Sequence, residues 1–244
     1  RTCLMPSFIE ASWPAPAGVR AFSTTRNGGK SEGPFKSLNL GLHVGDEPGR
    51  VKENRGLLKD SLELPSEPQW LNQVHGNQTA RPVQGQIQTA DAMLTDAKGT
   101  VCAVMTADCL PLLLCSEDGA YVAAVHAGWR GLAQGVVGET IRAIGTTQLL
   151  AWMGPAIGPE SFEVGLDVYR EFSAQEPRFS QAFTPVREGK WMLNIYELTK
   201  LILLREGVSS VYGGDYCTVK EADRFFSYRR ERITGRMATL IWRE

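Results

Sequence analysis

The sequence predicts a mixed α/β fold with one domain spanning residues 1–244, and three observations support this class. Two short apolar runs, Val101–Thr106 and Tyr121–Val125, have the length and composition of buried strands. After His126 the apolar residues recur at helical spacing, so we expect a helix to begin near residues 129–131. The chain has no internal repeat, low-complexity tract or linker, which favours one compact domain.

The first half of the chain predicts further elements in order. Val19–Thr25 alternates as a strand does, and Pro48–Leu62 is a charged amphipathic stretch typical of a surface helix. Residues 37–46 alternate polar and apolar residues, which would place Asn39 and His43 on one side. Trp70–Gly76 predicts a strand that ends beside His75.

The second half predicts strands and helices around one irregular loop. Residues 154–159 contain two prolines and two glycines, which exclude regular structure and suit the wall of a site. The expected strands are Leu149–Met153, Ser209–Tyr212 and Met237–Trp242, and the expected helices are Asp167–Phe172 and Asn194–Glu206.

Composition excludes several classes of function. The formal net charge of -1 gives no electrostatic case for binding nucleic acid or a membrane surface, and no apolar run reaches the length of a membrane span. The first 16 residues lack the features of a signal peptide, and the five cysteines are odd in number and scattered. We therefore expect a cytoplasmic protein. We also expect a monomer that acts on small molecules, although the composition does not determine the oligomeric state.

Two residues near strand ends carry the reactive groups. Cys109 follows Asp108 where a strand breaks, whereas Cys102 and Cys115 fit small buried apolar residues. His126 ends the next apolar run, and Arg130 follows at the expected helix start. The pattern predicts a thiol, an imidazole and an arginine around one pocket. Asp91, before another apolar pair, is expected to cap a turn or orient a ligand.

Five short segments together resemble a known family. These segments are Asn72–Gly76, Thr106–Cys109, His126–Gly131, Gly154–Gly158 and Phe226–Arg230. Through them the chain, from about Trp13 to its end, resembles the bacterial laccase-domain proteins, also called the multicopper polyphenol oxidase or purine nucleoside phosphorylase family.

This resemblance implies a layered α/β/β/α fold, distantly similar to the cytotoxic necrotizing factor deamidases. It also implies a zinc or copper ion on His75, Cys109 and His126. The activities attributed to the family are phosphorolysis of adenosine, inosine and methylthioadenosine, deamination of adenosine, and oxidation of phenols. A further attributed role is the removal of wrong amino acids from peptidoglycan precursors.

The residues of this chain support these activities to different degrees. A four-copper centre needs about ten imidazole ligands, and the chain has three histidines, so oxidase chemistry is the weakest alternative. Zinc suits two histidines and a cysteine, with the fourth position open. Asp108 then either supports the metal site, carries a proton or caps a turn. Without metal, Cys109 and His126 form a thiolate–imidazolium pair suited to amide hydrolysis.

Phosphorolysis requires an anion pocket, partners for ribose and an aromatic platform for the base. Arg26, Arg130 and a helix N-terminus are expected to hold phosphate, Asn39 and His43 the ribose, and Phe226 or Tyr228 the purine. The expected catalytic residues are Asp108, Cys109, His126 and Arg130. The expected substrate-binding residues are Arg26, Asn39, His43, Gln73, Trp129, Phe226 and Tyr228.

The leading hypothesis is a purine nucleoside phosphorylase with adenosine deaminase activity, one zinc ion, and nucleoside and phosphate as its small-molecule substrates. The alternatives are a Cys-His amidase that edits peptidoglycan precursors, a copper-dependent polyphenol oxidase and a non-enzymatic metal-binding module.

Overall fold

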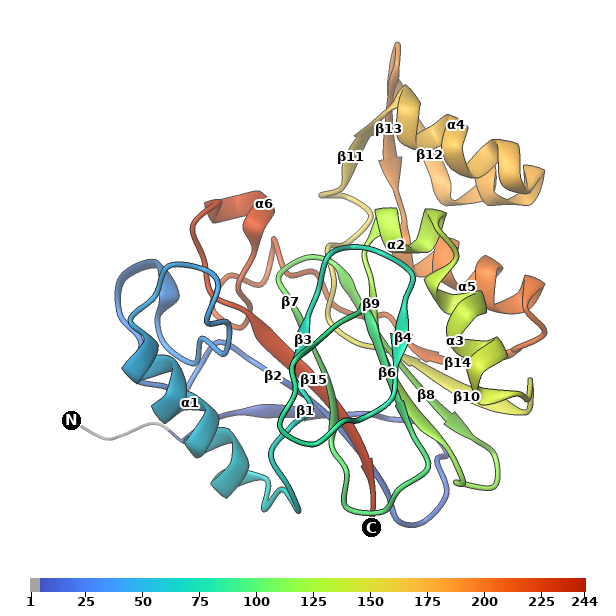
Figure 1. Ribbon diagram of the computed structural model, residues 1–244. Helices are drawn as coiled ribbons and strands as arrows, with labels where there is room; N and C mark the ends of the chain where they lie inside the picture. The colour runs from blue at the N-terminus through green and yellow to red at the C-terminus, as the bar shows by residue number, and fades with distance from the viewer. Residues whose placement is uncertain (1–4) are drawn as a thin grey trace.

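The computed structural model describes residues 5–244, and two β-sheets packed face to face form its centre (Figure 1). The larger sheet contains, in spatial order, β14 (Ser210–Gly213), β10 (Leu149–Met153), β8 (Leu110–Ser116), β9 (Val122–Ala127), β6 (Ala92–Thr95) and β4 (Thr79–Ala80). The smaller of the two contains β1 (Phe8–Glu10), β2 (Val19–Thr24), β15 (Met237–Arg243) and β7 (Cys102–Thr106).

Helices cover the outer face of each sheet. On one side, α1 (Pro48–Ser61) packs Leu58 against the four-stranded sheet. On the other side, α2 (Trp129–Ala133), α3 (Val136–Ile144) and α5 (Ile195–Arg205) cover the six-stranded sheet. The mixed α/β class and the layered α/β/β/α arrangement are therefore confirmed.

The central strands are buried on both faces. In β8, Leu112 and Leu114 point towards the helices, whereas Leu113 and Cys115 point into the layer between the sheets. A strand covered on both sides needs no polar alternation, which explains why residues 101–127 form nearly continuous apolar runs. In these central strands the polar side chains stand at or next to the strand ends, as Thr106, Ser116 and His126 do.

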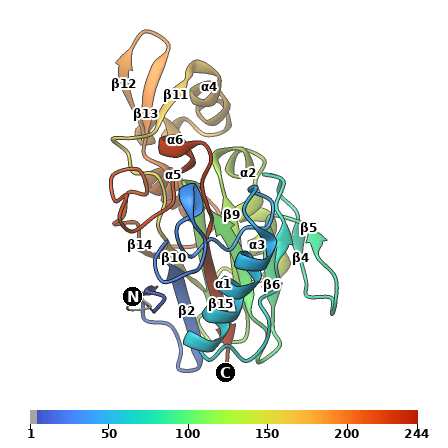
Figure 2. The ribbon, with the colours of Figure 1, turned by 90° about the vertical axis from the view of Figure 1, so that its left-hand side faces the viewer.

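A small third sheet projects from this body, and the sequence did not predict it. It contains β11 (Glu163–Gly165), β13 (Lys190–Leu193) and β12 (Phe183–Arg187), with α4 (Leu166–Gln175) packed beside it. Figures 1 and 2 both show the β12–β13 hairpin standing clear of the two large sheets. The remaining short elements are β3 (Leu71–Asn72), β5 (Gln88–Thr89), α6 (Tyr228–Glu231) and 3-10 turns at Gly33–Phe35 and Pro177–Ala182.

Most predicted strands and helices are present with bounds shifted by a few residues, but three local expectations are wrong. Residues 37–46 contain no strand. The strand expected over Trp70–Gly76 shrinks to β3, because the Asp91 carboxylate rather than a neighbouring strand accepts the backbone N–H groups of residues 74–76. The single helix after His126 is divided, because Gly135 adopts a φ of 85° between α2 and α3.

Two further expectations concern the whole chain. Cys3 lies outside the described residues, and the four cysteines within them are free thiols. No helix in the span 5–244 combines the length and hydrophobicity that crossing a membrane requires.

We predict that Leu112→Ala and Leu113→Ala destabilise the protein alike, by about 2–5 kcal/mol each, since both leave a cavity in a packed layer. Both side chains are fully buried. Urea unfolding followed by circular dichroism measures the change. Leu204→Ala, at a position 43% exposed on α5, serves as the control and should change stability by about 0.5 kcal/mol or less. A near-neutral result for either buried leucine would contradict the double-layer packing.

Candidate active site

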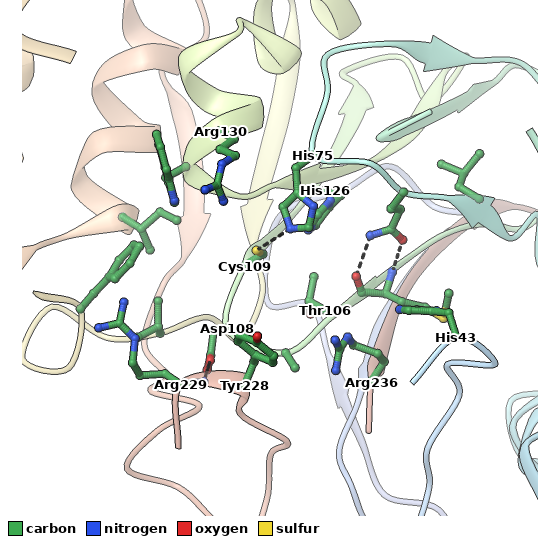
Figure 3. A pocket seen from close by; sticks show the side chains of 18 of the residues that line it. His43, His75, Thr106, Asp108, Cys109, His126, Arg130, Tyr228, Arg229 and Arg236 are labelled. Atoms are coloured by element: carbon green, nitrogen blue, oxygen red, sulfur yellow. Dashed lines mark hydrogen bonds between the residues drawn. The ribbon is translucent and has the colours of Figure 1, made fainter. Parts of the chain in front are cut away.

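Three segments bring His75, Cys109 and His126 together, as the sequence predicted. His126 belongs to β9, Cys109 directly precedes the neighbouring strand β8, and His75 lies in the loop after β3. Their side-chain ligand atoms all lie within 4.8 Å of one another. Figure 3 shows the three side chains converging on one wall of a cavity.

The spacing of this triad fits a tetrahedral metal ion. Cys109 Sγ lies 3.8 Å from His75 Nε2, and the rings of His75 and His126 meet edge to face with centroids 4.7 Å apart. Zinc bonds of about 2.0–2.3 Å at tetrahedral angles would hold sulfur and nitrogen ligands about 3.5 Å apart. The donor set also suits zinc, and three protein ligands leave a fourth position open.

Gly128 makes this close approach of side chains feasible. A Cβ atom at this position would lie 2.8 Å from Cys109 Sγ and 3.4 Å from His75 Cδ2. Any other residue would displace the thiol, so the Gly that follows β9 is a steric requirement of the triad.

Asp91 fixes both histidines. Its buried carboxylate accepts a hydrogen bond from His126 Nδ1 at 2.7 Å and from the backbone N–H groups of His75 and Gly76 at 2.9 and 2.8 Å. The bond to Nδ1 leaves His126 Nε2 as its ligand atom. The backbone bonds hold His75 in a left-handed conformation with a φ of 61°. The signal in the sequence was an acidic residue directly before a buried strand.

The triad without metal is a charge pair. Burial opposes ionisation of Cys109, but the positive charge of His126 and hydrogen bonds from both histidines outweigh it and lower the pKa of the thiol to about 6. Burial likewise opposes protonation of His126, but the Cys109 thiolate and the Asp91 carboxylate raise the pKa of its imidazole well above the usual value. A thiolate is therefore present near neutral pH, as metal binding and nucleophilic attack both require.

The triad opens onto a cavity of about 610 Å³. Six other residues singled out from the sequence line it, namely His43, Gln73, Asp108, Trp129, Arg130 and Tyr228. Gln73 spends its amide on the backbone N–H and carbonyl of Met105, each at 2.8 Å, so it shapes the wall. Three lining arginines that sequence reasoning missed are Arg229, Arg232 and Arg236. The last two follow α6 in the turn before β15, where the sequence offered only a turn signal.

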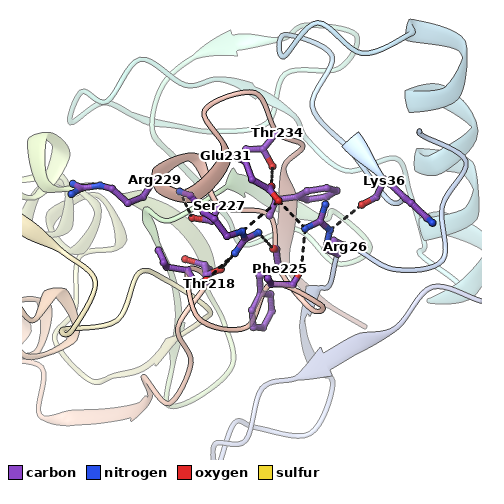
Figure 4. Close-up of polar contacts among 12 residues, drawn as sticks. Arg26, Lys36, Thr218, Phe225, Ser227, Arg229, Glu231 and Thr234 are labelled. Carbon is purple, nitrogen blue, oxygen red and sulfur yellow. Dashed lines mark hydrogen bonds and ion pairs between the residues drawn. The ribbon is translucent and has the colours of Figure 1, made fainter. Parts of the chain in front are cut away.

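Arg26 and Phe226 do not reach the cavity, which corrects their expected roles. The guanidinium of Arg26 donates to the carbonyls of Lys36 and Ala222 at 2.9 and 3.0 Å, lies 3.6 Å from the Glu231 carboxylate and rests on the Phe226 ring (Figure 4). Phe226 is fully buried and cannot stack on a base. Both residues are instead structural: Arg26 contacts Glu231 of α6, and Phe226 packs against Arg26 just before this helix.

Asn39 is also structural rather than ribose-binding. Its side chain is fully buried, and its Oδ1 accepts hydrogen bonds from the backbone N–H groups of Arg236 and Gly41 at 2.9 and 3.0 Å. The amide therefore joins two loops and holds the backbone of Arg236, which lines the cavity.

For Asp108 the geometry favours the capping alternative. It has a φ of 94°, and its carboxylate accepts hydrogen bonds from the Thr218 hydroxyl and the Arg229 backbone N–H, both at 2.6 Å. The second bond satisfies a free N–H in the first turn of α6. Both oxygens are thus engaged in joining the Cys109 loop to α6.

Arg130 lines the cavity on the side of Cys109 away from His43 and Arg236 (Figure 3). It is exposed, and its guanidinium lies over the Trp129 ring at 4.6 Å. The expected help from a helix N-terminus is weak, because α2 has only five residues and few aligned peptide dipoles.

Residues 20–244 match the family model described as multi-copper polyphenol oxidoreductase laccase. The chain belongs to this family. It is 49% identical to the purine nucleoside phosphorylase YfiH of Escherichia coli over 245 residues, covering 98% of this chain and 99% of that one. It is 47% identical to a purine nucleoside phosphorylase of Pseudomonas aeruginosa over 241 residues, with the same coverage.

Solved structures agree with the fold. A protein of Neisseria meningitidis matches with a TM-score of 0.94 and 49% identity, covering 97% of this chain and 99% of that chain. The YlmD protein of Geobacillus stearothermophilus matches with a TM-score of 0.90 and 34% identity, covering 95% and 94%.

We predict that alkylation of Cys109 in metal-free protein stays fast at pH 7 and slows as the pH falls through about 6. The sign follows from the lowered pKa of the thiol, because the reactive thiolate is lost only below that value. His126→Gln should move the midpoint towards the ordinary thiol value of about 8.5, slowing the reaction at pH 7 about tenfold or more. Iodoacetamide labelling with mass spectrometry of the Cys109 peptide measures the rate. A midpoint near 8.5 in the unsubstituted protein would refute the charge pair.

We also predict about one zinc ion per chain, with Asp91→Asn weakening zinc affinity about tenfold to a hundredfold. An amide in place of the carboxylate removes the charge that orients and polarises His126. Competition with a chromogenic chelator measures affinity, and Asp118→Asn, at an acid in the β8–β9 turn, is the control. Equal affinity of the Asp91 variant and the control would show that Asp91 only shapes the loop.

Proposed function

We propose that this protein is a cytoplasmic, monomeric purine nucleoside phosphorylase that acts on adenosine, inosine and S-methyl-5′-thioadenosine, with adenosine deaminase activity at a zinc site. The observation that carries the proposal is a cavity in which the His75–Cys109–His126 triad faces arginines that pair with no carboxylate of residues 5–244. The names of the relatives, purine nucleoside phosphorylase, support the same reaction class.

The cavity offers each part that phosphorolysis requires. The reaction breaks the bond between the base and ribose C1′ and joins C1′ to a phosphate oxygen. Arg130, steadied on the Trp129 ring, is placed to bind that phosphate through two parallel N–H groups. Tyr228, 47% exposed at the cavity rim, offers a face on which the purine can stack. His43 is near enough to the cavity to donate to a ribose hydroxyl.

Deamination is a separate reaction at the base, in which water adds to purine C6 and the amino group leaves as ammonia. Zinc held by His75, Cys109 and His126 would supply a Lewis acid that lowers the pKa of water, with copper as the other ion this donor set accepts. Asp91 keeps His126 in the tautomer that offers Nε2, and Gly128 leaves the thiol unobstructed. These residues shape the open position towards the cavity.

A second function is favoured by a specific contact. His126 lies between the Asp91 carboxylate and Cys109 in space and contacts both. The three residues are thus arranged as the acid, the base and the nucleophile are in Cys-His amidases. Such an enzyme would remove a wrong amino acid from a UDP-MurNAc peptide. The two functions exclude each other in one turnover, because a zinc-bound thiolate is a poor nucleophile. Oxidation of phenols is the weakest candidate, since the three histidines of the chain cannot hold several copper ions.

The deciding experiment compares zinc-loaded and chelator-treated protein. Adenosine with phosphate should yield adenine and ribose 1-phosphate, and adenosine alone should yield inosine, both in the zinc form. Release of an amino acid from a UDP-MurNAc peptide, fastest after zinc removal and abolished by Cys109→Ser, would replace the phosphorylase by the amidase.

We predict that Arg130→Ala raises the KM for phosphate about tenfold to a hundredfold while deamination suffers less. Loss of a charge-assisted contact costs about 1.5–3 kcal/mol, and deamination uses no phosphate. Arg130→Lys should restore only part of the loss, because a point charge lacks the two-pronged geometry. Steady-state kinetics of both reactions at varied phosphate give the comparison. An unchanged phosphate dependence would make Arg130 a packing partner of Trp129 and return the amidase to first place.

A further inference from the structure

One corner of the cavity holds a histidine and an arginine beyond the triad. His43 comes from the loop before α1, and Arg236 comes from the turn before β15. Figure 3 places this His43–Arg236 corner on the side of Cys109 away from Arg130. No role in the proposed reaction uses Arg236.

Hydrogen bonds fix the backbone of Arg236 and one end of its guanidinium group. Its Nη1 donates to the carbonyls of Thr234 and Gly235 at 3.1 and 3.0 Å, and its backbone N–H is bound by Asn39. Gly41 lets the side chain pass, since a Cβ atom there would lie 2.9 Å from Arg236 Cγ and 3.4 Å from His43 Cε1. A guanidinium has five N–H donors, and these anchors engage one end of it. The other end is left for the cavity.

The charge of Arg236 is only partly balanced by nearby acids. Among the described residues no carboxylate lies within ion-pair distance of it, and burial lowers the pKa of its guanidinium although the charges of Cys109 and Asp108 oppose this. The Asp108 carboxylate is engaged by Thr218 and Arg229. Burial, followed by the positive charges of Arg236 and Arg55, lowers the pKa of His43, which therefore stays neutral near pH 7. Because a partly buried cation without a bonded anion is costly, the protein alone leaves the free end of Arg236 poorly satisfied.

We propose that the His43–Arg236 corner is a second anion subsite that binds an oxyanion of the phosphate class. Arg236 supplies charge-assisted N–H donors from a fixed position. Neutral His43 has one ring N–H, which it gives to the oxyanion instead of a ribose hydroxyl when this corner is filled. The oxyanion is either inorganic phosphate or a phosphate group carried by the organic substrate. The assignment rests on the proposed function only in sharing its cavity.

The competing explanation is that Arg236 merely braces the turn at Thr234 and Gly235. Gly41→Ala separates the two, because it adds a methyl group against the arginine stem without changing any charge. Gly41 has no positive φ, so alanine is compatible with its backbone. Gly56→Ala on α1 adds the same methyl group where no atom lies within 4 Å and is the matched control.

The test is isothermal titration of the zinc-loaded full chain with inorganic phosphate, inosine 5′-monophosphate and inosine, each alone. No phosphorolysis occurs without both substrates, so a failure of the proposed activity cannot imitate a loss of binding. The variants are Arg236→Gln, Arg236→Lys, Gly41→Ala and Gly56→Ala, with Arg142→Gln as the control for removing a surface charge. Thermal melting verifies that each variant is folded.

Arg236→Gln should raise the Kd of the bound anion about tenfold or more, and Gly41→Ala severalfold. Arg236→Lys should fall between, while both controls bind as the unsubstituted protein does. An effect on inorganic phosphate assigns the subsite to the free ion. An effect on the nucleotide, with phosphate and inosine unchanged, assigns it to a substrate-borne phosphate. Unchanged affinities for both anions in Gly41→Ala and Arg236→Lys, whether or not Arg236→Gln folds, would overturn the subsite.

Discussion

The buried carboxylate of Asp91 is the constraint on which the site depends. An ionised group at this depth is stable only if every lone pair is used, and His126 together with the backbone of residues 74–76 meets that requirement. The same bonds impose a left-handed turn on His75 that a short strand could not supply. Asp91, which does not line the active-site cavity, thus decides where two of the three candidate ligands lie, and through His126 it sets the ionisation of Cys109.

A second constraint is the burial of both sheets. Strands β8 and β9 are apolar on each face, so polar chemistry is excluded along their length and gathers where they end. Cys109 stands at this border, one residue before β8, whereas Cys115 at the other end of the strand is sealed in the layer between the sheets. Burial raises the pKa of Cys115 to about 12, while Cys109 ionises near neutral pH. Cys115 is therefore an inert thiol because it lies within the strand, and Cys109 is a reactive one because it lies just outside it.

Sequence reasoning succeeded where local pattern and chemistry coincide. The strands around Cys109 and His126 and the mixed α/β class were predicted from pattern, whereas the meeting of His75 with both residues was implied by the family resemblance. It failed where a side chain's partner lies far along the chain. Arg26 was expected to hold phosphate, yet its guanidinium is engaged by the carbonyls of Lys36 and Ala222 and by the Glu231 carboxylate. Asn39 looked like half of a polar face, yet its partner is the backbone of Arg236. Neither pairing leaves a trace in local periodicity.

The projecting hairpin of β12 and β13 carries a hazard of its own. Strand β12 pairs on one side only and exposes Val186, so its free edge is a template on which another chain could add a strand. Pro185 lacks the N–H that such pairing needs, the register shifts between Pro185 and Arg187, and Arg187 places a charge on the rim. The lobe can therefore stand out into solvent without recruiting its neighbours into a growing sheet, which protects the protein from aggregation at the concentrations of a crowded cell.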